Sequence, residues 1–221
     1  MNWPTARDIA SACALPEGYR YQVLRQEQIP EVASAVLDWQ PTWRVGSASA
    51  FTQAAYYREK AFVEGGALRD VFVLLIRADE ELAAVLPMER LPEALTLYGS
   101  LAVVAPTHRG NLAPRMRGDY LEAVARLVGL EFIYAMATLR HRGAQRWFES
   151  MGYQLVGFAP GYDREEISPG VVMRVVEAIF AKSLVPAHAI FAPSLDQMTP
   201  AVREAYEAFS SRTGSHAQGA R

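Results

Sequence analysis

Arg109 and Gly110 stand where the pattern of the sequence changes, and together they offer the chemistry of an anion site. Residues 94–105 have the apolar composition of a strand, Pro106 interrupts it, and helical spacing follows from Leu112. The first amides of a helix have no acceptor within the helix, and the helix dipole adds partial positive charge, so a phosphate is attracted there. Arg109 adds a full charge, and Gly110 removes the Cβ that would hold a phosphate away from the backbone. The same dipeptide also occurs at ordinary turns from strand to helix, so alone it predicts no ligand.

Cysteine and histidine add little further chemistry. Cys13 is the single cysteine, which excludes an intramolecular disulfide and a thiolate metal cluster. The histidines show neither the i,i+4 spacing of a helical metal site nor another ligand pattern; they are His108, His141, His188 and His216. We therefore expect no metal cofactor.

The segments around Arg109 alternate between the periodicities of strands and helices. A strand pattern over residues 19–25 precedes two helical stretches, over 29–39 and 49–64. Three apolar strands with short polar connectors follow, which is typical of an antiparallel meander; they span 70–77, 82–90 and 94–105. Beyond Pro106 we expect one helix over 112–128, a buried strand over 132–138, a short helix over 144–151 and a strand over 153–158.

Residues 171–184 fit two structures. Their apolar residues recur every four positions, as in an amphipathic helix, yet their β-branched content and their place after a Pro-Gly turn are typical of a final strand. We favour a strand over 174–182 and keep the helix as the alternative. Further on, Thr199 and Pro200 are residue types of a helix cap and a first helical position, which predicts a short helix over 199–209.

Length and composition indicate one domain followed by an extension. The chain has 221 residues, 51% of them hydrophobic and 21% charged, which is the profile of a globular domain of ordinary size. We expect this domain over residues 1–190 and a C-terminal extension over 191–221. Residues 210–221 are small and polar and cannot bury enough apolar surface to offset the entropy of ordering them, so we predict a disordered tail there.

The charge balance excludes two classes of partner. A net charge of -2 without a basic stripe predicts binding neither to nucleic acid nor to an anionic membrane surface. Apolar runs such as residues 71–76 are much shorter than the roughly 20 residues of a membrane span, and the N-terminus lacks a basic start followed by an apolar stretch. We expect a cytoplasmic protein; its oligomeric state stays open, a homodimer included.

Two motifs on these segments resemble the GNAT superfamily of N-acetyltransferases. Val104-Ala105-Pro106-Thr107-His108-Arg109-Gly110 is similar to the exit from the family's fourth strand, where Arg-Gly leads into the acyl-CoA helix. His141-x-x-Ala144-x-x-Trp147-Phe148-x-x-x-Gly152-Tyr153 resembles the family's Asn-x-x-Ala-x-x-Leu-Tyr-x-x-x-Gly-Phe element. The resemblance covers residues 19–183. It implies an α/β (α+β) fold with a mixed, mostly antiparallel central sheet flanked by helices.

The resemblance also implies where acyl-CoA binds. Its pyrophosphate is expected against Arg109, Gly110, Asn111, Leu112 and Ala113. Its thioester is expected where the family splays strands four and five, with a backbone amide near Val103 or Val104 stabilising the oxyanion. The family pattern Arg-Gly-x-Gly-x-Gly/Ala here has Leu112 and Pro114 at two positions of small residues, and Pro114 has no amide hydrogen to donate.

The activity that the resemblance implies is direct transfer of an acetyl group from acetyl-CoA to an amine, without an acyl-enzyme. Candidates for general base and acid are the polar residues of the third and fourth family strands, Glu89, Tyr98 and Ser100, each of which fits a solvent-facing strand position equally well. Many family members have a tyrosine at the position of Phe148 to protonate the thiolate, which phenylalanine cannot do. Two alternatives stay open: a longer-chain acyltransferase using acyl-CoA or acyl-carrier protein, and a non-catalytic acyl-CoA-binding module. The sequence does not identify the amine.

Overall fold

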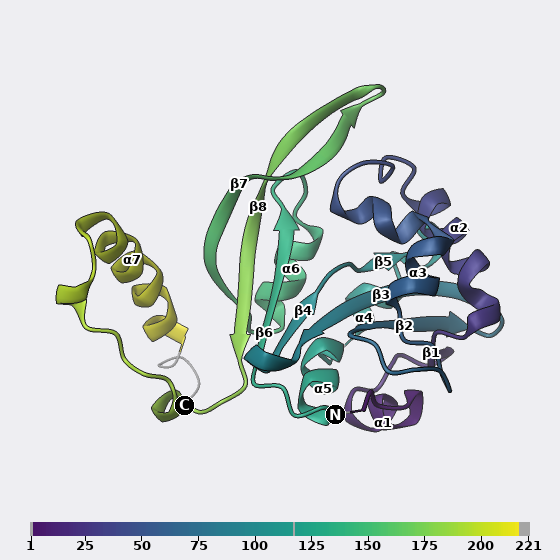
Figure 1. Cartoon of the computed structure of the whole chain (residues 1–221), viewed down its shortest axis with the longest axis horizontal. Coiled ribbons are helices and arrows are strands. Elements are labelled where there is room, and N and C mark those ends of the chain that lie inside the picture. The colour runs from purple at the N-terminus through teal and green to yellow at the C-terminus, as the bar shows by residue number, and fades with distance from the viewer. Residues whose placement is uncertain (1, 117, 217–221) are drawn as a thin grey trace.

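A computed structural model describes residues 2–116 and 118–216 and shows an eight-stranded sheet with helices on both faces (Figure 1). The strands are β1 (Tyr19–Val23), β2 (Val71–Ala78), β3 (Glu81–Leu91), β4 (Thr96–Gly99), β5 (Val103–Val104), β6 (Phe132–Thr138), β7 (Gln154–Ser168) and β8 (Val171–Ser183). The helices are α1 (Ala6–Ala12), α2 (Ile29–Trp39), α3 (Ala54–Lys60), α4 (Leu112–Arg115), α5 (Tyr120–Leu127), α6 (Gly143–Ser150) and α7 (Pro200–His216). Short 3-10 turns include η2 (Ser47–Thr52) and η4 (Pro106–His108).

The sheet is mixed and mostly antiparallel, as predicted. Its order is β1-β2-β3-β4-β6-β8-β7, and only the β4–β6 pair among these neighbours is parallel. Residues 171–183 form strand β8, so the strand interpretation is confirmed and the helical alternative is wrong. Strand β8 pairs with β7 in a long hairpin whose tip extends beyond the rest of the sheet (Figure 1).

Strand alternation divides the core into two layers. On β2, Phe72, Leu74 and Ile76 face the layer that also contains α1 and α5, whereas Val73 and Leu75 face the layer under α2 and α3. All five side chains have no exposed surface, because helices cover both faces of this strand. Helix α6 lies on the first of these faces, where Phe148 stacks on Phe180 of β8.

The predicted helix over residues 112–128 is wrong in one respect, since the chain forms two helices there, α4 and α5. Met116 is extended at the end of α4, and Asp119 caps α5 by accepting hydrogen bonds from the amides of Leu121 and Glu122. Gly118 packs against Cys13, and a Cβ at position 118 would lie only 2.6 Å from the Sγ of Cys13. The break is therefore fixed by a local cap and by a contact with α1.

Two further segments are less regular than predicted. The expected strand over 94–105 consists of β4 and β5, with residues 100–102 between them outside any strand. The helical stretch over 49–64 consists of η2 and α3, the latter ending at Lys60. The first of these differences has a functional consequence, because the interruption after Gly99 is where the sheet opens.

The C-terminal segment differs from its prediction at one end. Helix α7 begins at Pro200 as expected and continues to His216, beyond the predicted helix end at residue 209. The disorder expected for the tail stays a prediction. Residues 217–221 of the predicted tail lie outside the described residues. The boundary between a domain and an extension at residue 190 stays a prediction.

Deletion of residues 210–221 is expected to leave the melting temperature unchanged. Side chains 199–208 are exposed, and Phe209 is the last large apolar side chain before the deleted segment. The segment thus brings little apolar surface to bury against the sheet. Thermal denaturation of the intact and the truncated chain measures the difference, and a truncated chain that melts well below the intact one would contradict this prediction.

Candidate functional site

A gap opens in the sheet between β5 and β6. Strand β4 pairs with β3 on one side and with β6 on the other, but β5 pairs with β3 alone. The amides of Leu101 and Ala105 donate to carbonyls of Pro87 and Ala83 on β3. Because successive amides of an extended chain point to opposite sides, the amide of Val103 also points to β3, whereas that of Val104 points into the gap.

A cleft of about 340 Å³ runs through this gap and is lined from both faces of the sheet. On the face of α5 and α6 it is lined by Tyr120, Leu121, Trp147 and Phe148. On the face of α2 and α3 its lining includes Trp43, Ser47, Tyr98, Tyr162, Asp163 and Glu177. A ligand with one end on each face of the sheet therefore fits the cleft.

The structure brings together three of the residues predicted from the sequence. Tyr98, Ser100 and Val104 all line the cleft. Tyr98 stacks on Tyr134 with ring centroids 4.8 Å apart. Burial, followed by the neighbouring Tyr162 and Tyr134 hydroxyls, raises the pKa of Tyr98 well above its usual value. Its phenol consequently stays protonated and is available to donate a hydrogen bond.

Glu89 and Val103 lie beside the cleft and do not line it. Glu89 is opposite Tyr98 in the β3–β4 pair and is half-buried; its charge adds to burial in raising the pKa of Tyr56. Val103 is 1% exposed and packs into the layer under α2 and α3. Of the two amides considered for the oxyanion, that of Val104 is the one turned toward the gap.

Glu177 is a cleft residue that the sequence analysis missed. It lies on β8 opposite Thr138 of β6 and is only 6% exposed. Burial, followed by the charges of Glu165 and Asp163, raises the pKa of its carboxyl group to about 7. The signal in the sequence was a single acidic residue in the apolar run from Val175 to Ala181, and it became meaningful only once that run was known to be a strand beside the gap.

The predicted phosphate-binding residues run from the end of η4 into the first turn of α4, beside the gap. The exposed Arg109 donates from Nε to the carbonyl of Val104 and from Nη2 to that of Trp39, both at 3.1 Å. The backbone amide of Asn111 donates a hydrogen bond to the carbonyl of His108, so that amide is not free to bind a ligand. Leu112 is fully buried in the core, so its side chain fixes the turn. Gly110 has open space where a Cβ would lie.

Phe148 is a core residue that also borders the cleft. It is 7% exposed and contacts Trp147, Tyr153 and Phe180, with ring centroids between 5.1 and 5.3 Å apart. Its packing role is therefore established. His141, which stands where the resembling motif has asparagine, is exposed at the rim of the cleft.

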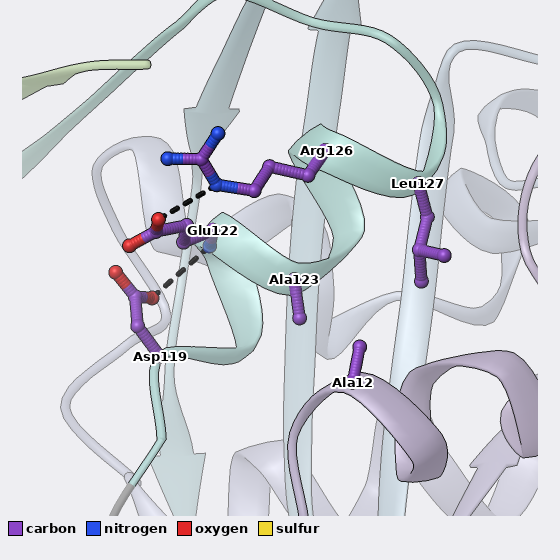
Figure 2. Close-up of a pocket in the computed structure, with 6 residues that line it drawn as sticks. All are labelled: Ala12, Asp119, Glu122, Ala123, Arg126 and Leu127. Carbon is purple, nitrogen blue, oxygen red and sulfur yellow. Dashed lines mark hydrogen bonds and ion pairs between the residues drawn. The ribbon is translucent and has the colours of Figure 1, made fainter.

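Figure 2 shows a second hollow, between α1 and α5, lined by Ala12, Asp119, Glu122, Ala123, Arg126 and Leu127. Its charged groups are paired: Arg126 bonds Glu122 at 2.7 Å, and Asp119 caps α5 and bonds Lys182 at 3.1 Å. It shares no lining residue with the cleft. Because its charges already satisfy one another, this hollow offers no free group for chemistry.

The described residues form neither a metal site nor a membrane-spanning helix. Among residues 2–116 and 118–216, no group of three or more His, Cys, Asp or Glu side chains is placed to hold a metal ion. None of the described helices has the length and apolarity that crossing a membrane requires.

Solved structures of acetyltransferases share the fold of this chain. RimL, a ribosomal-protein alpha-N-acetyltransferase solved with coenzyme A, matches with a TM-score of 0.59 at 12% identity over 78% of this chain and 97% of its own. The fold is that of the GNAT acetyltransferases. YncA, a putative acetyltransferase from Salmonella typhimurium, was solved with acetyl-CoA. It matches with a TM-score of 0.54 at 14% identity over 80% of this chain and 100% of its own.

A putative phosphinothricin N-acetyltransferase matches the GNAT fold of this chain as well, at a TM-score of 0.54 and 18% identity over 76% of this chain and 99% of its own. No protein-family model and no curated protein matches the chain. At these identities the likeness establishes the GNAT fold. The reaction has to be argued from the cleft.

Proposed function

We propose that this chain is an acyl-CoA-dependent N-acetyltransferase that transfers an acetyl group directly to an amine. The observation that carries the proposal is the cleft through the sheet, which joins an aromatic-lined face under α5 and α6 to a face lined with ionisable groups, with Arg109 bonded to the carbonyl of its lining residue Val104. A long thioester entering from the first face places its carbonyl in the gap, and an amine entering from the second meets it there.

The entrance fits the pyrophosphate of coenzyme A. A guanidinium has five N–H donors, and two carbonyl bonds hold that of Arg109 at the mouth of the gap with donors left for phosphate. Gly110 leaves the backbone open to a close approach, and the first amides of α4, at Leu112 and Ala113, have no acceptor within that helix. Pro114 has no amide hydrogen to contribute. Pyrophosphate binding therefore depends more on the charge of Arg109 here than it would in a glycine-rich turn, where more backbone amides are available.

The gap supplies the groups that acyl transfer needs. As the amine attacks the thioester carbonyl, negative charge develops on the oxygen, and the inward amide of Val104 is placed to donate to it. Acetyl-CoA filling the gap would displace water from it, which would strengthen that hydrogen bond. The protonated phenol of Tyr98 is the candidate to protonate the departing thiolate, in place of the hydroxyl that Phe148 lacks.

A thermal-shift series tests this function against the two alternatives. Coenzyme A, acetyl-CoA and longer acyl-CoAs are compared at equal concentration, since a ligand that binds only the folded state raises the melting temperature. We expect acetyl-CoA to give a clear rise of at least the size that coenzyme A gives. A larger rise with a long-chain acyl-CoA would favour the longer-chain acyltransferase, and binding without release of free thiol in the presence of amines would favour the non-catalytic module.

A further inference from the structure

Three carboxyl groups surround the amine side of the cleft, and one of them has no partner. Asp163 accepts hydrogen bonds from the amide and hydroxyl of Ser47, at 2.8 and 2.6 Å. Glu165 pairs with Arg140 at 2.6 Å. Across the part of the chain that the structure describes, Glu177 receives no hydrogen bond and no cation, although it is more than nine-tenths buried and lines the cleft.

The groups around Glu177 do not neutralise it. On β7, Asp163 and Glu165 act on Glu177 through their charges, and Arg164 between them also lines the cleft but is exposed and forms no ion pair with Glu177. Tyr98 and Tyr162 are neutral phenols that line the cleft, and His141 is exposed at its rim. A buried carboxylate without donor or counter-charge is unfavourable, and a cation that brings its own N–H groups would stabilise its ionised form.

We infer that Glu177 binds the acceptor amine as its ammonium cation and is the base that deprotonates it, so that the enzyme selects alkylamines without an anionic group near the nitrogen. This inference rests on the proposed function, whose acceptor it specifies. An amine that carries a carboxylate would be repelled by Asp163 and Glu177 together, whereas an alkylammonium would give Glu177 the donors it lacks. An ammonium group offers three N–H donors.

The proton balance is complete with the groups present. The Glu177 carboxylate takes one proton from the ammonium, and the freed nitrogen lone pair attacks the thioester carbonyl, forming the C–N bond. When the C–S bond breaks, its electron pair leaves on sulfur, and the sulfur takes a proton from the Tyr98 hydroxyl. The acetylated nitrogen then loses a proton, which reprotonates Tyr98. The products are the N-alkylacetamide, the coenzyme thiol and one proton, which Glu177 returns to water.

The test compares n-butylamine with γ-aminobutyrate, which differs by a terminal carboxylate, in NMR titrations of the protein with coenzyme A present. We expect n-butylamine to bind about tenfold or more tightly than γ-aminobutyrate, and Glu177→Gln to abolish most of this preference. Glu166→Gln, on the same hairpin but outside the cleft lining, is the matched control and should keep the preference. Equal binding of the two amines, or an unchanged preference in Glu177→Gln, would overturn the inference.

A second readout uses the unmodified protein and so does not depend on how the variant folds. An alkylammonium keeps its proton below its pKa of about 10.4, so its affinity should follow the ionisation of Glu177 and rise as pH increases through about 7. An affinity for n-butylamine that does not change between pH 5 and 8 would overturn the assignment to Glu177. So would loss of the preference for n-butylamine in Glu89→Gln but not in Glu177→Gln. Acetyl-CoA binding is measured separately: if it binds and the cation does not, this inference alone fails, and if acetyl-CoA does not bind, the proposed function fails.

Discussion

Replacing Arg109 by glutamate is expected to weaken acetyl-CoA binding by about 100-fold, or ~2.7 kcal/mol. The exposed guanidinium is held at the entrance to the gap by the carbonyls of Val104 and Trp39, with donors left for a pyrophosphate. A carboxylate there would remove a charge-assisted hydrogen bond and repel the phosphates. Titration calorimetry at low ionic strength measures the affinity, and the difference from the unmodified protein should shrink as salt is added.

Two further variants distinguish the effect of charge at position 109 from the effect of a change in the net charge of the protein. Arg109→Ala removes the attraction without adding repulsion, so it should weaken binding less than Arg109→Glu. Arg203→Glu makes the same charge change on α7, where the arginine pairs with Glu207 on the surface, and should leave the affinity unchanged. An Arg109→Glu protein that is folded and binds acetyl-CoA with full affinity would exclude this entrance as the pyrophosphate site.

Replacing Val104 by proline is expected to lower turnover by about 100- to 1000-fold while the protein stays folded. Proline removes the amide hydrogen that points into the gap, replaces it by a ring carbon that restricts the backbone, and leaves the carbonyl that Arg109 bonds. Because Val104 does not donate to β3, the sheet loses no hydrogen bond. Steady-state release of thiol from acetyl-CoA measures turnover, and a thermal melt reports the fold.

Val103→Pro is the matched control for this experiment. Its amide points to β3, between the observed bonds of Leu101 and Ala105 to that strand, so proline there removes a ladder hydrogen bond and should destabilise the fold. The two neighbouring prolines are thus expected to act oppositely, one on turnover and the other on stability. Full turnover in Val104→Pro would show that the oxyanion is stabilised by another group.

The sequence was sufficient for the fold because its motifs combine local patterns with a particular order of elements. The segment from Val104 to Gly110 and the element from His141 to Tyr153 stand at the distances that the resembling family shows, and the structure confirms the mixed sheet. Periodicity failed at residues 116–119, where the apolar spacing continues but Asp119 caps a new helix. The contact of Gly118 with Cys13 could not be predicted either, since it joins residues far apart in the sequence.

The site was harder to predict than the fold because its groups meet only through strand pairing. Tyr98 and Ser100 were candidates because the resembling family opens its sheet beside them, and both line the cleft. Glu177 was missed because residues 171–184 were ambiguous between strand and helix, and only the strand places this carboxylate opposite Thr138. Its neighbours Asp163 and Glu165 come from the other arm of the hairpin, through a pairing that contains register shifts.

A crystal structure of the protein with acetyl-CoA is the most direct test of the account. We expect the pyrophosphate against Arg109 and the first turn of α4, the pantetheine chain in the gap between β5 and β6, and the thioester carbonyl within hydrogen-bond distance of the Val104 amide. The methyl end should face the side of the sheet that carries Tyr98 and Glu177. Acetyl-CoA bound in the hollow between α1 and α5, or a gap that stays empty in crystals grown at saturating acetyl-CoA, would contradict it.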